Sequence, residues 1–353
     1  MRVLVTGGAG FIGSSIALEL AARHPEMDVL AADNLYRRGS ELNLPRLKAA
    51  GVTFHHADVR QLADLQAIGP FDALVECSAE PSVMASLGGG ADYVVQANLV
   101  GAYHCLEAAA RQGAQLIFLS TSRVYPVAAQ ESLITTEGET RLELAAEQPL
   151  AGASAAGIAE DFPLTGARTL YGATKLAAEL LIEEYRAERG LSAVVNRCGV
   201  VAGPWQMGKV DQGVFTHWML SFMLGRPLSY IGYGGTGKQV RDLLHVADLV
   251  DLVAEQLADP QRWDGRTFNV GGGREVSLSL LETTAICREL TGSDLEVGSV
   301  AETRQGDVPV YLSDCAALFS HTTWRPRRGV RDILTDIHEW VVVNEALVLG
   351  ALG

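Results

Sequence analysis

Tyr171 and Lys175 are the pair of residues whose types and spacing point most directly to acid–base chemistry. They lie four positions apart in LYGATKLAAELLIEEYRAERG, a segment with helical periodicity, so one helix face should carry both side chains. A phenol has a pKa of about 10, and it becomes a useful base at neutral pH only when a nearby cation stabilises the phenolate. The spacing therefore predicts a tyrosine base tuned by a lysine.

A group of hydroxyl side chains precedes this pair by about 50 residues. The stretch FLSTSRVYPV places Ser120, Thr121 and Ser122 at the end of an apolar run, directly before Arg123. An apolar run that ends in small polar groups is typical of a strand whose carboxyl end opens onto a crevice. We expect these hydroxyls to serve the same chemistry as the tyrosine.

The N-terminal stretch VTGGAGFIG predicts a dinucleotide site. It supplies Gly7, Gly10 and Gly13 between a strand-like run and a helical run. Glycine permits a tight turn and close approach of a pyrophosphate, and the helix N-terminus offers N–H groups with partial positive charge. Asp33 ends the second strand-like run 20 residues after Gly13, where a carboxylate is expected to bind the adenosine ribose 2′-OH.

The cofactor predicted from this motif is NAD, tightly bound. The Asp33 carboxylate would repel a 2′-phosphate, although Arg37 and Arg38 keep NADP open. Asp58 and Val59, after the third strand-like run, are expected to contact the adenine. The predicted cofactor contacts are Gly7, Gly10, Phe11, Ile12, Gly13, Asp33, Asn34, Asp58, Val59, Ser78, Ala79, Tyr171 and Lys175.

The elements that must position these residues alternate between strand-like and helix-like segments over the first 120 residues. Such alternation predicts an α/β fold with a Rossmann-type doubly wound parallel sheet and a smaller C-terminal substrate-binding lobe. Residues 1–195 should form the NAD-binding domain, with 128–167 as a long loop or lid, because that segment has no clear periodicity. Residues 196–353 should form mainly the substrate lobe, with 240–260 returning to the first domain.

Composition excludes several classes of function. Hydrophobic residues make up 48% and the net charge is -14, so a globular protein without a nucleic-acid or membrane partner is expected. The apolar run at the N-terminus is too short for a signal peptide. No apolar run reaches the roughly 18 residues expected of a membrane-spanning helix. The five cysteines show no metal-ligand spacing, so we expect no metal and free thiols in the cytoplasm.

At this point the sequence resembles the extended short-chain dehydrogenase/reductase family of nucleotide-sugar epimerases and dehydratases. TGGAGFIG, STSRVY, YGATK, GKQVRDLLHVADLV, FNVGGG and the residues Trp324 to Pro326 occur in the family's order over nearly the whole chain. DNLYRRGSELN and FNVGGGREVSLSLLE are most similar to the CDP-paratose (CDP-tyvelose) 2-epimerase type. The resemblance implies a nucleoside-diphosphate sugar as substrate, and a homodimer formed through helices around 92–112 and 171–189.

The resemblance also implies roles for individual residues. Tyr171 would be the catalytic base, Lys175 would tune it, and Thr121 would bind the reacting sugar oxygen. Arg241 and Arg304 would bind the diphosphate, since a guanidinium can bind two oxygens at once. The full set of expected substrate contacts is Glu80, Ser82, Ser122, Arg123, Asn196, Gln212, Arg241 and Arg304.

The residues after Thr121 discriminate among reactions. Similar dehydratases carry an Asp-Glu pair there and decarboxylases a glutamate, whereas this chain has Ser122 and Arg123. Neither can act as a carboxylic acid, which favours epimerisation, that is an isomerase, through a transient ketone. A 4-epimerase, a 4,6-dehydratase, an NADPH-dependent reductase and a non-catalytic NAD(H) sensor remain alternatives. ECSAEPS replaces the family's usual histidine-containing run and places Glu76 and Glu80 near the cofactor.

Overall fold

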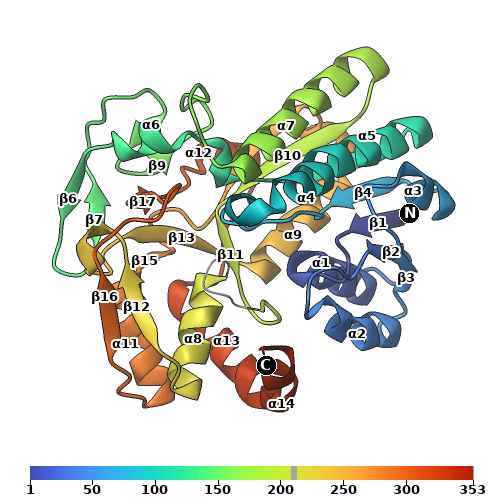
Figure 1. Ribbon diagram of the computed structural model, residues 1–353. Helices are drawn as coiled ribbons and strands as arrows, with labels where there is room; N and C mark the ends of the chain where they lie inside the picture. Colours follow the sequence, from blue (N-terminus) through green and yellow to red (C-terminus); the bar gives the residue numbers. More distant parts are fainter. Residues whose placement is uncertain (208–212, 353) are drawn as a thin grey trace. The chain divides into compact units, whose positions relative to one another are not determined.

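The structure is a computed structural model that describes residues 1–207 and 213–352. Two compact units are present, each assembled from separate stretches of chain (Figure 1). Unit 1 contains Met1–Val124, Leu170–Arg197 and Leu249–Thr267, and unit 2 contains Tyr125–Thr169, Cys198–Asp248 and Phe268–Gly353.

A seven-stranded sheet forms the centre of unit 1, with the last residues of its two latest strands assigned to unit 2. The order is β3-β2-β1-β4-β5-β10-β14, which is the doubly wound arrangement predicted from the sequence. Each pair among the first five strands is parallel. The strands are β1 (Arg2–Thr6), β2 (Asp28–Asp33), β3 (Thr53–His56), β4 (Ala73–Glu76), β5 (Gln115–Thr121), β10 (Ala193–Cys198) and β14 (Arg266–Val270).

Continuous apolar runs explain why these strands are central. Every residue of β5 is buried, as expected for a parallel strand that is covered on both faces. Figure 1 shows α5 and α7 side by side, and both pack on β5. The helices of this part of the chain are α1 (Phe11–Arg23), α2 (Leu44–Ala49), α3 (Leu62–Ala67), α4 (Ala91–Val95), α5 (Gly101–Gln112), α7 (Leu170–Arg189), α9 (Val246–Ala258) and α10 (Pro260–Trp263), with short turns η1 (Ser40–Asn43), η2 (Ser86–Gly90), η3 (Gln96–Val100) and η4 (Ser122–Val124).

Unit 2 has its own core, in which α8, α11 and α13 pack together around Trp218, Cys287 and Ile337. Its largest sheet has the order β11-β13-β15, with β17 also paired to β13. The strands are β6 (Thr135–Glu137), β7 (Leu142–Leu144), β8 (Ala153–Ser154), β9 (Gly157–Ile158), β11 (Val200–Ala202), β12 (Leu228–Ile231), β13 (Val240–His245), β15 (Ser277–Ser279), β16 (Val297–Val300) and β17 (Val310–Tyr311), and the helices are α6 (Val127–Glu131), α8 (Val214–Leu224), α11 (Leu280–Thr291), α12 (Ala316–His321), α13 (Val330–Val343) and α14 (Glu345–Leu352), with the turn η5 (Tyr233–Gly235).

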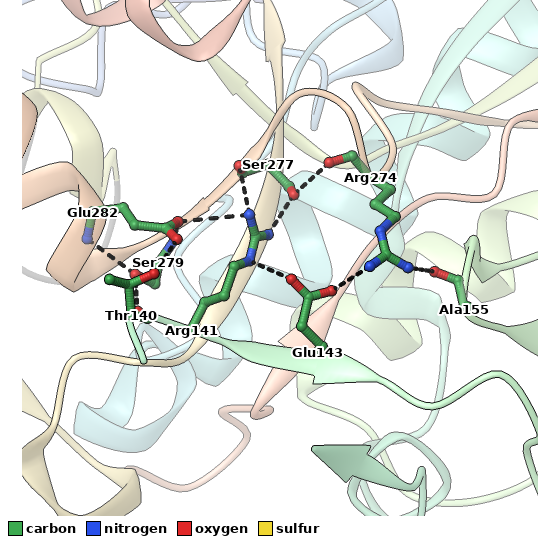
Figure 2. A network of polar contacts seen from close by, with 8 residues as sticks. All are labelled: Thr140, Arg141, Glu143, Ala155, Arg274, Ser277, Ser279 and Glu282. Carbon is green, nitrogen blue, oxygen red and sulfur yellow. Dashed lines mark hydrogen bonds and ion pairs between the residues drawn. The ribbon is translucent and has the colours of Figure 1, made fainter. Parts of the chain in front are cut away.

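The segment 128–167 differs from the expected loop of the first domain. It contains most of α6 and the two hairpins β6–β7 and β8–β9, and it belongs to unit 2. Figure 2 shows why: Arg141 pairs with Glu143 and Glu282 and donates to Ser277, while Arg274 pairs with Glu143. With this segment, unit 2 is comparable in length to unit 1 rather than smaller.

The other expected boundaries also shift. The second stretch of unit 1 ends at Arg197 instead of 195, and the returning stretch is Leu249–Thr267 instead of 240–260. Among the described helices, none combines the length and apolar character needed to cross a bilayer. Within the same residues no cluster of three or more His, Cys, Asp or Glu side chains is arranged to hold a metal ion, and the five cysteines are free thiols.

Candidate active site

The glycine turn lies at the switch point of the sheet, where β1 and β4 are neighbours and their connections diverge. Gly7 has φ +63°, and a Cβ there would stand 2.8 Å from the carbonyl oxygen of Cys77. A Cβ on Gly13 would stand 2.1 Å from the Gly7 oxygen. Helix α1 begins at Phe11, and no side chain caps it from Gly10. The turn thus offers bare backbone and uncapped helix N–H groups, which fits a pyrophosphate.

Asp33 fastens this turn to the end of β2. Its Oδ2 accepts the N–H of Ala9 at 3.1 Å, and its Oδ1 accepts the N–H of Leu35 at 2.8 Å. Burial raises the pKa of Asp33, while these backbone N–H groups oppose the rise. The carboxylate therefore has a structural role in the turn, beside the ribose contact predicted for it.

Asp58 and Asn34 lie together at the carboxyl ends of β3 and β2. The Arg60 guanidinium binds both oxygens of Asp58, with Nη2 2.6 Å from Oδ2, and Asn34 donates to the same oxygen at 3.2 Å. Arg60 lowers the pKa of Asp58 to about 2. The carbonyl of Val59 lies 2.8 Å from Nδ1 of His104. The structure thus brings together the residues predicted to surround the adenine.

Sequence reasoning missed two aromatic residues at this place. Tyr36 stacks on Tyr93 with ring centroids 4.2 Å apart, and the Arg60 guanidinium lies 5.0 Å from the Tyr93 centroid. Tyr36 is 63% exposed, so this stacked pair is available to a flat ligand. The signal that could have found Tyr36 was its place three residues after Asp33.

Lys175 reaches into the core of unit 1 and meets an acid that the sequence motif did not include. Its Nζ lies 3.1 Å from Oε2 of Glu76 at the end of β4, and each of the two side chains is only 2% exposed. The same ammonium lies 4.1 Å from the centroid of the Phe118 ring on β5. Burial alone would lower the pKa of Lys175, but Glu76 and Tyr171 raise it. Burial raises the pKa of Glu76, and Lys175 opposes the rise.

Gly172 explains how the first turn of α7 approaches the hydroxyl stretch. Helix α7 packs on η4, and a Cβ on Gly172 would stand only 2.0 Å from the carbonyl oxygen of Arg123. The absence of a side chain therefore lets the turn that carries Tyr171 lie against the turn that follows Thr121. Thr121 is buried, and its Oγ1 accepts the N–H of Arg123 at 3.2 Å. Ser122 and Tyr171 are half-buried.

The loop after β4 is fastened to helix α7 by Asn98. Its amide accepts the N–H of Glu80 at 2.7 Å and donates to the carbonyl of Glu80 at 3.1 Å and to Oγ1 of Thr174 at 3.3 Å. The Glu80 carboxylate accepts the N–H of Ser82 at 3.1 Å. Ser78 and Ala79, predicted to contact the cofactor, are half-buried in this loop. Asn98 is a positioning residue that the sequence motifs did not reveal.

Asn196 is a correction to the predicted substrate contacts. Its side chain is fully buried and exchanges two hydrogen bonds of 2.9 Å with the amide of Gln256. The neighbouring Arg197 is also buried, and its guanidinium binds both oxygens of Glu179, which also accepts from Ser120. Asn196 thus joins β10 to α9, and the group of Arg197, Glu179 and Ser120 joins β10, α7 and β5 in the core.

The predicted diphosphate contacts lie in unit 2. Arg241, on β13, is paired with Asp307 and also donates to the carbonyl of Val308 at 2.6 Å. Arg304 is half-buried. The pKa of His217 on α8 is lowered by burial and then by the positive charges of Arg226 and Arg304. Gln212, also predicted to bind substrate, lies outside the described residues.

Comparisons with known proteins agree with this geometry. Residues 3–271 match the model of the NAD dependent epimerase/dehydratase family. The chain is 28% identical over 353 residues to CDP-paratose 2-epimerase of Salmonella typhi, covering 96% of this chain and 99% of that protein. It is 28% identical to the structure of Thermus thermophilus UDP-glucose 4-epimerase with NAD, with TM-score 0.76 and coverage of 96% and 98%. For the dTDP-glucose 4,6-dehydratase of Streptomyces venezuelae with NAD bound, the identity is 27%, the TM-score 0.78 and the coverage 98% of each chain.

The family match covers most of the chain, and its fold and glycine turn are those of the described structure. The relatives are enzymes that act on nucleotide sugars, and they include both epimerases and dehydratases. The chain therefore belongs to the NAD dependent epimerase/dehydratase family, whose cofactor is NAD.

Proposed function

We propose that the protein is a nucleotide-sugar epimerase of the CDP-paratose 2-epimerase kind, with tightly bound NAD. The single observation that carries the proposal is the combination of Tyr171, Lys175 and Thr121 with an arginine at position 123, where an acid would serve elimination. The similarity to CDP-paratose 2-epimerase over almost the whole chain supports the same choice.

In the proposed reaction, the Tyr171 phenolate removes a proton from a sugar hydroxyl, and Thr121 donates a hydrogen bond to the same oxygen. When bound, NAD would supply reversible hydride transfer at the sugar carbon. Epimerisation requires the transient ketone to turn within the site, and Tyr171 then gives back the proton. Lys175 stabilises the phenolate throughout.

The side chain of Arg123 supports epimerisation over elimination. Removal of a hydroxyl as water needs a group that can donate a proton to it, and an arginine guanidinium, which keeps its proton in proteins, is a poor donor. Arg123 follows Thr121 by two residues, and its N–H is bonded to the threonine oxygen. We infer that Arg123 binds an anionic part of the substrate.

A dehydratase is the second candidate, because a dTDP-glucose 4,6-dehydratase of Actinoplanes is 27% identical over 356 residues. The two reactions can be separated by incubating the holoenzyme with a panel of nucleotide sugars in D₂O and following the products by NMR. Epimerisation with internal hydride return leaves little deuterium on sugar carbon, whereas elimination incorporates it. Deuterium on carbon, with loss of a hydroxyl, would establish the dehydratase.

The role of Tyr171 is tested by Tyr171→Phe. Because general base catalysis contributes roughly 10²–10⁴-fold, we expect turnover to fall by at least about 100-fold while NAD binding persists. Tyr185→Phe is the matched control: it removes a phenol hydroxyl from the same helix, where that hydroxyl donates to Glu107. Near wild-type turnover of Tyr171→Phe, measured by coupled assay, would refute the assignment.

We also propose a cytoplasmic homodimer. The free thiols support a reducing compartment. Tyr103 on α5 and Leu180 on α7 are 40% and 56% exposed, and these are apolar groups on two helices that pack side by side. Sedimentation of the wild type should give twice the chain mass, and Leu180→Glu should give the single-chain mass. A monomeric wild type at micromolar concentration would contradict the dimer.

A further inference from the structure

The Glu76–Lys175 pair has an unusual position for an ion pair, because it is buried and its lysine lies one helical turn from the proposed base. Strand register places Glu76 at the carboxyl end of β4, opposite Thr6 of β1 on one side and Phe118 of β5 on the other. Lys175 enters from α7 one turn after Tyr171. Both side chains are 2% exposed, so water screens neither charge.

The groups around Lys175 show which of them can compensate the charge of its ammonium. The groups that face the pair are Tyr171 on its own helix, Cys77 after β4, Cys105 on α5 and the Phe118 ring on β5. Burial, followed by Glu76, raises the pKa of Cys105, so its thiol is neutral at physiological pH. Glu76 is thus the acid that the structure shows paired with the Lys175 ammonium.

We propose that Glu76 is a positioning residue that fixes the Lys175 ammonium under Tyr171 and neutralises part of its charge. Tyr171 then titrates beside an ion pair instead of beside a bare ammonium. The proposal rests on the proposed function in one respect, which is that the Tyr171 phenolate acts as the catalytic base. Its physical content, the effect of Glu76 on Tyr171, can be measured without any substrate.

The direction of the effect follows from electrostatics. A negative charge next to Lys175 reduces the field with which the ammonium stabilises the phenolate. Glu76→Gln removes this charge and keeps an oxygen of similar reach for the ammonium. The Tyr171 phenolate should therefore form at lower pH in the variant, by about one pH unit, since the charges are close and buried.

The experiment is an ultraviolet difference titration of tyrosinate. The titration curve of Tyr171→Phe is subtracted from that of the wild type, and the curve of Glu76→Gln/Tyr171→Phe from that of Glu76→Gln. Each subtraction isolates the midpoint of Tyr171. Isothermal titration with NAD on all four proteins, after removal of bound cofactor, reports whether the site is intact. A lower midpoint with Glu76→Gln supports the proposal, and an equal or higher midpoint overturns it.

Glu179→Gln is the matched control. Glu179 is a buried carboxylate of the same unit, paired with Arg197 at 2.8 Å, so its loss tests for general loosening of the core. Its Tyr171 midpoint should equal that of the wild type, and an equal shift in both variants overturns a specific role of Glu76.

A second variant tests the same proposal if Glu76→Gln does not fold. Glu76→Gln/Lys175→Met removes both charges and leaves no unpaired buried ion. Its Tyr171 midpoint should be at or above the wild-type value, because the whole pair is gone, and a lower midpoint overturns the proposal. The result is separate from the fate of the proposed function, which depends on the turnover of Tyr171→Phe.

Discussion

Two almost completely buried carboxylates, Glu76 in unit 1 and Asp242 in unit 2, are held in different ways. Glu76 in unit 1 is 1% exposed and faces the Lys175 ammonium. Asp242 in unit 2 is 0% exposed, its Oδ2 accepts backbone N–H groups from Gly273 and Ser313, each at 3.2 Å, and the side chain of Ser313 is a further hydrogen-bond partner. Its Oδ1 has no hydrogen-bond partner within the described part of the chain.

The difference shows that a buried carboxylate can serve either as one partner of an ion pair or as an acceptor that holds backbone segments together. An ion pair can hold both partners ionised in the core, and it becomes costly only when one partner is lost. A carboxylate held by neutral backbone and serine donors is poorly compensated, and burial raises the pKa of Asp242 to about 6. Gly271 and Gly199 approach its oxygens so closely that a Cβ on either would stand within 2.8 Å. Glu76 is therefore part of a buried charged pair, whereas Asp242 is part of a compact structural joint.

The largest expected effect comes from breaking the pair in unit 1. Lys175→Met leaves Glu76 buried without a cation, and we expect the free energy of unfolding to fall by about 3–5 kcal/mol. Burial raises the folded-state pKa of Glu76 above its unfolded value. The loss should therefore be small below a pH of about 4.3 and grow as pH rises through the folded pKa.

Urea titrations at a series of pH values measure this loss. The control is Glu76→Leu/Lys175→Met, which removes both charges and should recover most of the stability. If Lys175→Met unfolds with the same free energy as the wild type at pH 7, leaving Glu76 without its cation has no cost. The contrast between Glu76 and Asp242 would then be wrong.

Asp242→Asn tests how the buried carboxylate of unit 2 affects the pH dependence of stability. The folded pKa of about 6 exceeds the ordinary 3.8, so the stability contributed by this group is present below pH 3.8 and is lost as pH rises through 6. The asparagine variant lacks that loss. Relative to the wild type, its unfolding free energy should therefore increase by about 2–3 kcal/mol between pH 4 and pH 7.

The pH dependence is obtained from denaturant midpoints of both proteins. Asp294→Asn, at an exposed carboxylate of the same unit, should run parallel to the wild type. A constant difference between Asp242→Asn and the wild type would mean that Asp242 titrates normally, and that its burial carries no electrostatic cost.

The smallest effect is expected in the ionic network of Figure 2. Glu143 bridges Arg141 and Arg274, but the three side chains are 31%, 21% and 48% exposed. Because water screens such pairs, Glu143→Gln should cost at most about 1 kcal/mol, and about 1 M salt should remove most of that cost. A loss as large as that of Lys175→Met would show that burial does not decide the value of these pairs.

The features that sequence predicted well are local. The glycines at 7, 10 and 13 and the pair Tyr171 and Lys175 act through spacing within one turn or one helix, so the pattern alone places them. The doubly wound parallel sheet was also predicted from the alternation of elements.

The features that sequence could not predict depend on partners far along the chain. Glu76 lies 99 residues from Lys175, and Asn196 lies 60 residues from Gln256. Because both faces of β10 are buried, the apolar pattern could not distinguish a pocket residue from one inside the core. The sequence pattern predicts a loop at 128–167 because its strands have only two or three residues, and its ion pairs are formed with Lys238 and Glu282, far along the chain.

The division of the chain has a consequence for how the protein is made. The chain passes from one unit to the other five times between Met1 and Gly353. The sheet of unit 1 cannot be completed until β14 has been synthesised, when about three quarters of the chain exists. Neither unit is a contiguous stretch that could be cut out or exchanged as a module. Both cores must therefore mature together, through contacts of high sequence separation that slow folding.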